Sequence, residues 1–417
     1  MTSADLVDVG TLPPVGELPR RMWAQAVRQA DLGAPAKAFK RLIVDVPTPG
    51  PSEVLVAVMA AGINFNNVWA AQGIPIDVIA VRQRAGEPYD FHIGGSDASG
   101  IVYAVGSDVT RVSVADEVVL HPGHWDVDDP FIRAGGDPMV APSARIWGYD
   151  TNFGSFGQFC VAQEHQCMPK APGLTWDEAA APTLVGATAY RMLFGWSGNK
   201  CGRGDLVLVW GGAGGLGTQA IQLAKHADAT VAAVVSDEAR GEYCMRLGAS
   251  GYINRREFDH WGIPPHWTDT EGQKAWMSGA RAFGRALEAI LGGRAGPHIV
   301  FEHPGETTIP TSMYVCRPGG MVVICAGTTG YSAVADLRYL WTRQKRLQGS
   351  HGANDEQAYA YNDLVGGGVI DPCVGEVVPF DDIGLVHQDM LDGRLGPGNA
   401  VALVGTPAVG LGRSTTA

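Results

Sequence analysis

The clearest hydrophobic pattern in the chain is an apolar run that ends in a cluster of glycines and continues as an amphipathic segment. Residues 207–210 are consecutive apolar residues, as in a parallel strand that is buried on both faces. Glycines fill most of positions 211–217, and residues 218–225 place apolar side chains at helical spacing. Strand, glycine turn and helix in this order predict a site for a dinucleotide pyrophosphate.

Glycine is needed in such a turn because it allows a tight bend and lets backbone N–H groups approach the phosphates. The helix N-terminus adds partial positive charge. The residues assigned to the cofactor on this basis are Gly211, Gly212, Ala213, Gly214, Gly215, Leu216 and Gly217. A turn with a purely structural purpose is the alternative.

Before this stretch, short apolar segments alternate with Gly- and Pro-rich turns. Strands are predicted at 41–46, 53–61, 94–102 and 115–119, and a short helix at 22–27. This pattern favours a β-rich, barrel-like domain. Thr175 followed by Glu178 has the spacing of a capping box and predicts a helical region that leads to about residue 193.

After the glycine stretch, apolar runs at 230–235, 299–305 and 320–327 predict further parallel strands. Residues 255–285 form a polar, Trp-containing insertion before a helix predicted at 280–291. The loops that follow the later strands face the ligand crevice in a doubly wound sheet, so His303, Ala326 and Gly327 are further candidates for cofactor binding.

Composition describes a globular chain of two domains. The chain has 417 residues, of which 46% are hydrophobic and 18% charged. The formal net charge of −12 argues against a nucleic-acid surface. Any anionic ligand must therefore be met by local Arg and Lys residues.

The seven cysteines are odd in number and include no Cys-x-x-Cys pair, so reduced thiols are expected rather than a disulfide framework. The N-terminal residues lack the pattern of a signal peptide, and no apolar run approaches the length of a membrane span. A cytoplasmic protein without a membrane partner is expected.

The nature of the dinucleotide depends on the residues after the second strand of the nucleotide domain. In NAD-binding domains an acidic side chain at this place bonds the ribose 2′-hydroxyl, whereas a basic one accommodates a 2′-phosphate. Residues 236–240 carry both signs. Ser236 can donate to a phosphate and Arg240 can pair with it, which favours NADPH, although Arg240 can equally be a solvated helix residue.

Several strings together resemble the crotonyl-CoA carboxylase/reductase (enoyl-CoA carboxylase/reductase) family of the medium-chain dehydrogenase/reductase superfamily. The strings are residues 64–69, 145–151, 301–305, 325–330, 349–351 and Asn354, within a resemblance that spans about 40–405. It implies an α/β fold with a GroES-like catalytic domain from residues 1–185 and 346–417 and an inserted Rossmann domain at 186–345. It also implies a homodimer or homotetramer.

The activity that the resemblance implies is NADPH-dependent reductive carboxylation of 2-enoyl-CoA thioesters. Hydride delivered to Cβ leaves an enolate, and capture of carbon dioxide at Cα gives a 2-alkylmalonyl-CoA, whereas protonation gives a saturated acyl-CoA. A non-carboxylating enoyl-CoA (acrylyl-CoA) reductase is therefore the alternative within the fold. A catalytically idle NADPH-binding interaction protein is the alternative from another class.

Carbon dioxide is uncharged and weakly basic, so holding it requires several fixed donors and the exclusion of water. The carbon dioxide pocket of the family carries over to Asn66, to the pair Tyr149 and Asp150, and to His351. Asp150 departs from the family, which commonly has Glu there, and this departure bears on carboxylation rather than on reduction. His351 read alone is more typical of a structural histidine, but its position before Gly352, together with the family match, favours a role in the site.

The acyl-CoA substrate has further candidate contacts. Gly352 stands where the family often has Phe, which indicates room for an acyl chain longer or more branched than crotonyl. Arg338 matches a basic family position, and Lys345 and Arg346 are nearby candidates for the phosphates of CoA. An ordinary solvated helix face is the alternative for these cations.

No metal is expected. Zinc-dependent members of the superfamily resemble one another in a Gly-His-Glu string and a lobe of four cysteines. The corresponding stretch here, residues 95–100, has no histidine, and no cysteines have zinc-ligand spacing. His121, His124 and His303 remain as individual candidate ligands.

Overall fold

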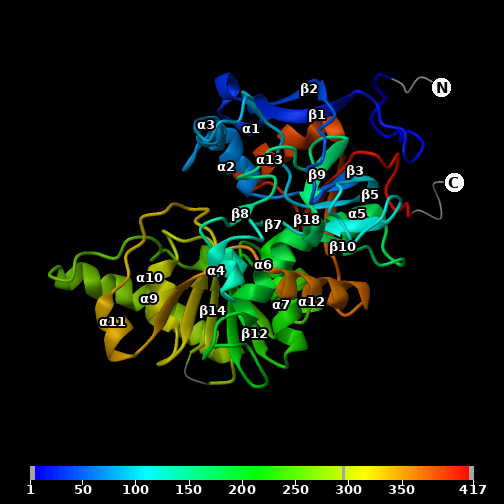
Figure 1. Ribbon diagram of the computed structural model, residues 1–417. Helices are drawn as coiled ribbons and strands as arrows, with labels where there is room; N and C mark the ends of the chain where they lie inside the picture. The colour runs from blue at the N-terminus through cyan, green and yellow to red at the C-terminus, as the bar shows by residue number, and fades with distance from the viewer. Residues whose placement is uncertain (1–4, 294–295, 413–417) are drawn as a thin grey trace. The chain divides into compact units, whose positions relative to one another are not determined.

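The structure is a computed structural model that describes residues 5–293 and 296–412 (Figure 1). Its internal contacts divide the chain into two compact units. The β-rich unit comprises Met1–Ala187, Gly352–Gly368 and Pro372–Ala417, and the α/β unit comprises Thr188–His351 and Val369–Asp371. Among the described residues, no helix has both the length and the apolar character needed to cross a bilayer.

The β-rich unit is built on a sheet of seven strands. The strand order is β10-β6-β5-β3-β18-β17, and β9 also pairs with β3. The central strand β3 is almost entirely buried, and most of its residues belong to the hydrophobic core of this unit. The strands of this sheet are β3 (Glu53–Ile63), β5 (Ala98–Val105), β6 (Glu117–Leu120), β9 (Phe159–Gln163), β10 (Cys167–Pro169), β17 (Val374–Pro379) and β18 (Asn399–Leu403).

Two smaller sheets and several short helices complete the β-rich unit. One small sheet has the order β2-β1-β4, and the other pairs β7 with β8. These strands are β1 (Arg21–Arg28), β2 (Phe39–Asp45), β4 (Phe91–His92), β7 (Gly123–His124) and β8 (Arg145–Ile146). The α-helices are α1 (Pro35–Ala38), α2 (Asn66–Gln72), α3 (Val78–Arg84), α4 (Pro130–Arg133), α5 (Trp176–Ala180), α12 (Asp355–Gly366) and α13 (Ile383–Leu391), and most of α6 (Thr183–Phe194) lies in the α/β unit.

The helix predicted at 22–27 is wrong, because Arg21–Arg28 is the strand β1. Met, Ala and Gln favour a helix locally, but β1 pairs along its length with the antiparallel strand β2, from Arg21 opposite Asp45 to Val27 opposite Phe39. This pairing satisfies the backbone and buries Met22 completely, so tertiary contacts override local propensity.

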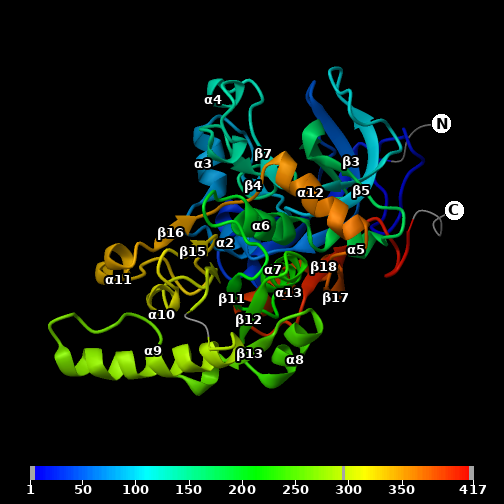
Figure 2. The same ribbon diagram turned by 90° about the horizontal axis from the view of Figure 1, so that it is seen from below.

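The α/β unit contains a six-stranded parallel sheet of order β13-β12-β11-β14-β15-β16 (Figure 2). Helices carry the chain from one parallel strand to the next. The strands are β11 (Leu206–Trp210), β12 (Thr230–Val235), β13 (Gly251–Asn254), β14 (Ile299–Glu302), β15 (Met321–Ile324) and β16 (Arg346–Gly349). The helices are α7 (Gly215–His226), α8 (Glu238–Arg246), α9 (Thr270–Ile290), α10 (Ile309–Val315) and α11 (Leu337–Thr342).

Two boundaries differ from those expected. The helix predicted from residue 280 begins at Thr270, where the Asp269 carboxylate accepts from Gly272 N–H and caps the helix. Residues 346–349 form β16 and pair with β15, so they belong to the parallel sheet although the sequence assigned them to the other domain. The apolar residues of α9 recur at helical spacing from Trp276 to Leu287, but its first turn is polar and does not mark where the helix begins. Strand β16 is short and only half buried, so hydrophobic alternation does not mark it.

Candidate active site

The glycine turn after β11 has the close backbone packing that a pyrophosphate cradle requires. Gly211 adopts a positive φ of 57°. A Cβ placed on Gly217 would lie 2.3 Å from the Gly211 carbonyl oxygen, and one on Gly212 would lie 2.8 Å from the Ala233 Cβ. Helix α7 then begins at Gly215, so its free N–H groups point toward the turn. The tight strand–turn–helix predicted from the sequence is therefore present, and its role in holding a pyrophosphate stays a prediction.

Two loops at the carboxyl ends of β14 and β15 interlock beside this turn. Thr328 N–H donates to the His303 carbonyl and Thr329 N–H donates to the Pro304 carbonyl. The His303 ring lies against the glycine turn, since a Cβ on Gly211 would come within 2.4 Å of its Nε2. His303 Nε2 lies 3.1 Å from the Trp210 carbonyl oxygen, and burial lowers the pKa of His303 to about 4. His303 is therefore a neutral ring that donates from Nε2 at this edge of the sheet.

Glu302 anchors these loops and was not identified from the sequence. Its side chain is completely buried at the end of β14. Its carboxyl oxygens accept from Gly305 N–H at 3.1 Å, from Thr308 Oγ1 at 2.6 Å and from Ser312 Oγ at 2.6 Å. Burial raises the pKa of Glu302 to about 7. An acidic residue inside an otherwise apolar strand was the available signal.

The residues that were expected to select NADPH form one cluster after β12. Asp237 caps α8 by accepting from Arg240 N–H, and its carboxylate also accepts from Ser236 Oγ at 2.9 Å. The Arg240 Nε lies 3.1 Å from the same carboxylate, and the Arg240 side chain is 27% exposed. These hydrogen bonds hold the pKa of Asp237 below its usual range. Ser236 and Arg240 are thus held side by side through Asp237.

The Asn-rich stretch 64–67 is connected side chain by side chain to the segment 95–97. The Asn66 Nδ2 donates to Ser96 Oγ at 2.8 Å, and the Asn64 Nδ2 donates to Asp97 Oδ2 at 2.8 Å. Asn64, Ser96 and Asp97 are buried, whereas Asn66 is partly exposed. Burial raises the pKa of Asp97 well above its usual range. Asn66 starts helix α2, so this stretch is not only the loop that turn-forming residues suggest.

The turn of Tyr149 and Asp150 lies close to the segment 95–97, because the preceding residue, Gly148, packs against Gly95. Gly148 has a φ of 68°, and a Cβ there would lie 1.9 Å from the Gly95 carbonyl oxygen, so only glycine allows this approach. Asp150 Oδ2 accepts from Ile146 N–H at 2.7 Å. The Tyr149 ring packs against the apolar cluster of Ala70, Val78 and Ile79, which connects it to α2.

Between His351 and Gly352 the chain passes from the α/β unit to the β-rich unit. Gly352 is buried in the β-rich unit with a φ of 54°, and a Cβ there would lie 2.8 Å from Met139 Cε and 3.1 Å from Ile146 Cδ1. Position 352 therefore borders the turn that carries Tyr149 and Asp150. His351 is exposed and is the last residue of the segment that belongs to the α/β unit.

Comparison with known proteins agrees with this architecture. Residues 50–172 match the family model "Alcohol dehydrogenase GroES-like domain", and residues 215–366 match "Zinc-binding dehydrogenase". A crotonyl-CoA carboxylase/reductase of Cereibacter sphaeroides is 47% identical over 98% of this chain and 93% of its own length. The chain belongs to the crotonyl-CoA carboxylase/reductase family.

Solved structures of this family superpose closely on the chain. The crotonyl-CoA carboxylase/reductase AntE in complex with NADP has 52% identity and a TM-score of 0.93, covering 97% of this chain and 100% of that one. The 2-octenoyl-CoA carboxylase reductase CinF, in complex with NADP and 2-octenoyl-CoA, has 35% identity and a TM-score of 0.86, covering 95% and 90%. The medium-chain dehydrogenase fold with a GroES-like and a Rossmann-like domain is thus established for this member.

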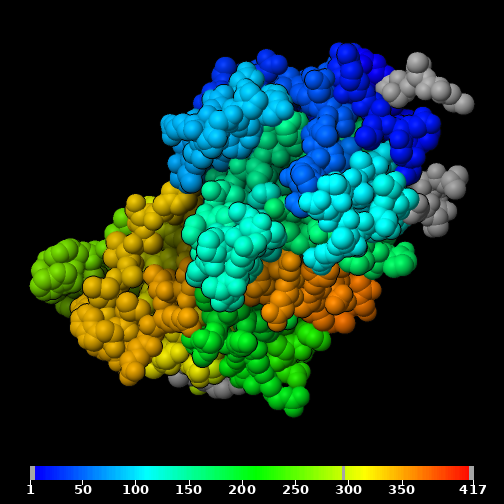
Figure 3. All heavy atoms as spheres, in the orientation of Figure 1, coloured from blue at the N-terminus to red at the C-terminus, as the bar shows by residue number. Residues whose placement is uncertain are grey.

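The cationic side chains expected to bind the phosphates of CoA differ in their exposure and in the protein groups that they already contact. Helix α11 lies at the surface of the α/β unit (Figure 3, yellow-orange). Arg338 on this helix is about half exposed, and its guanidinium pairs with Asp336. Arg346 donates to the Ser197 carbonyl at 2.8 Å. Lys345 is buried, and its ammonium donates to the Met313 and Tyr314 carbonyls. Burial lowers the pKa of Lys345, and its position makes it a structural residue rather than a phosphate contact.

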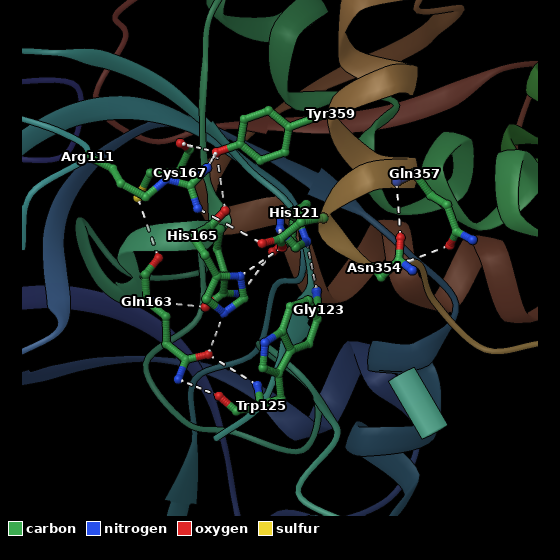
Figure 4. Close-up of polar contacts among 12 residues, drawn as sticks. Arg111, His121, Gly123, Trp125, Gln163, His165, Cys167, Asn354, Gln357 and Tyr359 are labelled. Atoms are coloured by element: carbon green, nitrogen blue, oxygen red, sulfur yellow. Dashed lines mark hydrogen bonds and ion pairs between the residues drawn. The ribbon is translucent and has the colours of Figure 1, made fainter. Parts of the chain in front are cut away.

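His121, His165 and Asp355 form a cluster in the β-rich unit whose ligand atoms lie within 4.8 Å of one another (Figure 4). Both rings bond to one carboxylate oxygen: His121 Nε2 and His165 Nδ1 each lie 2.9 Å from Asp355 Oδ1. A metal-binding histidine normally donates its second N–H to an acceptor. His121 Nδ1 instead accepts from Gly123 N–H, so His121 Nε2 carries the proton and donates to Asp355.

The His165 ring is held in the same way by fixed partners. Gln163 bonds both backbone groups of Trp125, which places its Oε1 toward His165 Nε2 at 2.9 Å. His165 therefore donates from both nitrogens, and its ring stacks on Trp125. The cluster connects the start of α12 to the segments that follow β6 and β9. Hydrogen bonds from the two histidines hold the pKa of Asp355 below its usual range despite burial.

Removal of Asp355 should leave two buried ring donors without their acceptor. We expect Asp355→Ala to lower the free energy of unfolding by about 2 kcal/mol at neutral pH, as measured by urea denaturation. Glu356→Ala is the matched control, because Glu356 is the adjacent, exposed carboxylate and should change stability by less than about 0.5 kcal/mol. Equal effects of the two substitutions would contradict a supporting role for the cluster.

Proposed function

We propose that this protein catalyses the NADPH-dependent reductive carboxylation of 2-enoyl-CoA thioesters to 2-alkylmalonyl-CoA. The observation that carries the proposal is the fixed amide of Asn66 beside the turn of Tyr149 and Asp150. It occurs in a chain 47% identical to a crotonyl-CoA carboxylase/reductase. The relatives AntE and CinF, both solved with NADP, support the cofactor, and CinF with 2-octenoyl-CoA supports the substrate class.

The residues present fit a dinucleotide, because the glycine turn leaves no room for a Cβ at Gly212 or Gly217 and directs the start of α7 toward the turn. In the proposed complex the glycine turn, Gly211 to Gly217, holds the pyrophosphate. Ser236 and Arg240 meet the 2′-phosphate, and His303, Ala326 and Gly327 border the nicotinamide end. When bound, NADPH supplies the hydride that reduces the enoyl double bond at Cβ.

The chain's own residues are proposed to hold carbon dioxide and to exclude water. Asn66 Nδ2 carries two hydrogens. Among the described residues, Ser96 Oγ accepts one of them, so the second can donate to a carbon dioxide oxygen. Asp150 Oδ1 has no hydrogen-bond partner among these residues and can orient an ordered water, while Oδ2 accepts from Ile146 N–H in its own turn. Tyr149 and His351 complete the proposed set of catalytic residues.

A non-carboxylating enoyl-CoA reductase is the second candidate function. It is favoured by Asp150, whose short side chain bonds back to Ile146 N–H and so reaches less far than a glutamate. In that case the same residues bind cofactor and thioester, and a proton rather than carbon dioxide reaches Cα.

Further parts of the proposal concern metal, partners and location. Hydride transfer is proposed to proceed without zinc, because the side chains of Ser96 and Asp97 are engaged by Asn66 and Asn64. Arg338 and Arg346 are proposed to meet the phosphates of CoA in a homo-oligomeric enzyme. The seven cysteines are all free thiols, which supports a reducing compartment such as the cytoplasm.

Initial rates test the proposed function. Oxidation of NADPH should require a 2-enoyl-CoA, should be faster with NADPH than with NADH, and should accelerate when carbon dioxide is added to a depleted buffer. A rate that does not respond to carbon dioxide favours the reductase. Absence of NADPH oxidation with every enoyl-CoA favours the idle binding protein.

Gly352 is proposed to set the length of the acyl chain. We expect Gly352→Phe to lower kcat/KM for 2-octenoyl-CoA about tenfold more than for crotonyl-CoA, because the added ring would displace the Met139 and Ile146 side chains that pack against this position. Gly352→Ala is the control for backbone strain at its positive φ and should affect both substrates alike. A wild-type enzyme that strictly prefers crotonyl-CoA over hexenoyl- and octenoyl-CoA would contradict this role.

A further inference from the structure

Asn67, the residue next to Asn66, is completely buried. Its Oδ1 accepts from the backbone N–H of Gly95 at 3.2 Å. A backbone N–H can only donate, so this contact settles which end of the Asn67 amide is oxygen and which is nitrogen. The Asn67 Nδ2 then lies 3.0 Å from Asn66 Oδ1 and donates to it.

The direction of this first bond determines the direction of the next. Because Asn66 Oδ1 accepts from Asn67, the Asn66 Nδ2 must face the opposite way, where it donates to Ser96 Oγ. Ser96 alone does not determine this orientation, since a hydroxyl can donate to a carbonyl as readily as it can accept from an amide. Without Asn67, the Asn66 amide would be free to turn around.

The backbone is shaped to admit the Asn67 side chain. A Cβ on Gly94 would lie 1.9 Å from Asn67 Oδ1, so the amide lies directly against this glycine. The next residue, Gly95, supplies the donor and at the same time receives Gly148, the neighbour of Tyr149. The same short corner thus holds Asn67 and the turn of Tyr149 and Asp150.

We propose that Asn67 is a positioning residue that fixes the amide of Asn66 so that an N–H, and not the carbonyl, is presented to carbon dioxide. This inference rests on the proposed function. The two oxygens of carbon dioxide are partially negative, so an N–H attracts such an oxygen, whereas an amide carbonyl oxygen in the same place repels it. Asn67 therefore acts on the choice between carboxylation and simple reduction without contacting the reactants.

The test compares Asn67→Leu with Asn66→Ala and with wild type. Asn67→Leu keeps the approximate volume and removes both hydrogen bonds. We expect the KM for carbon dioxide to rise about tenfold and the saturated, non-carboxylated product to increase in proportion. Reduction measured without carbon dioxide should stay within about threefold of wild type, because the residues that bind cofactor and thioester are unchanged.

Asn399→Leu is the matched control. Asn399 is also buried in the β-rich unit and donates from its Nδ2 to a backbone carbonyl, that of Pro372. Its loss should lower the melting temperature without changing the ratio of products. The inference is overturned if Asn67→Leu keeps the wild-type KM for carbon dioxide, or if carboxylation and reduction fall equally.

Two further results separate the inference from the function on which it rests. If Asn66→Ala leaves the ratio of products unchanged, the proposed role of Asn66 fails. If Asn66→Ala changes the ratio and Asn67→Leu does not, only the role of Asn67 fails.

Asn67→Asp provides the test if Asn67→Leu does not fold. The protonated acid can accept from Gly95 and donate to Asn66, whereas the carboxylate cannot donate. The fraction of carboxylated product formed by Asn67→Asp should therefore fall as the pH rises between about 6 and 9. It is measured relative to wild type, because the nearby titratable groups His92 and Asp97 are present in both proteins. A ratio to wild type that does not change with pH would overturn the inference.

Discussion

Gly217→Ala is expected to lower the free energy of unfolding by about 3 kcal/mol and to weaken NADPH binding at least about tenfold. The added Cβ would lie 2.3 Å from the Gly211 carbonyl oxygen and 2.7 Å from the Gly212 Cα. Both neighbours are backbone atoms, so the strain can be relieved only by moving the glycine turn away from α7. Urea denaturation of the apoenzyme and titration with NADPH measure the two effects.

Gly214→Ala is the matched control in the same turn. A Cβ there would meet only the Gly211 carbonyl oxygen, at an ordinary 3.5 Å, and Gly214 has a negative φ of −80°. Its apoenzyme should therefore be as stable as wild type to within about 0.5 kcal/mol, while its affinity for NADPH should fall because the methyl group would enter the proposed pyrophosphate site. A stable Gly217→Ala apoenzyme would show that the turn is not packed as described.

The second large effect is expected at Glu302. Burial raises its pKa to about 7 in the folded protein, whereas an unfolded glutamate titrates near its ordinary value of about 4.3. Between these two values the folded state holds a proton that the unfolded state has released. The contribution of Glu302 to stability is therefore fully present below about pH 4.3, decreases as the pH rises, and levels off above about pH 7.

Glu302→Gln should remove this part of the pH dependence. We expect the fall in unfolding free energy between about pH 5 and pH 8 to be smaller by about 2 kcal/mol than in wild type, measured by denaturation at each pH. Glu306→Gln is the control, because Glu306 lies in the same loop and accepts from Ser332 N–H in an exposed environment. An unchanged pH profile in Glu302→Gln would contradict a proton held at this carboxyl.

Local rules predicted the elements that carry their own signals. The capping box of Thr175 and Glu178 is present at α5, and the apolar runs 207–210 and 230–235 lie in the parallel strands β11 and β12. The strand at Arg21–Arg28 could not be predicted in this way, because its stability comes from pairing with β2 rather than from its own residues.

The same distinction applies to the site. The glycine turn follows from the sequence, and the family resemblance is what makes Asn66 a candidate site residue. The orientation of the Asn66 amide follows from neither, because it depends on the Gly95 N–H, which lies 28 residues away from Asn67 in the chain. Burial determines what Glu302 and Lys345 do, and the burial of these two residues cannot be predicted from the local sequence pattern.

The most direct measurement uses ¹³C-labelled bicarbonate, NADPH and crotonyl-CoA, with the acyl-CoA products identified by mass spectrometry and NADPH consumption followed in parallel. The proposed reaction predicts one labelled carboxyl group in an alkylmalonyl-CoA for each NADPH consumed. An unlabelled, saturated acyl-CoA formed in the same proportion to NADPH would contradict it and assign the protein as a reductase.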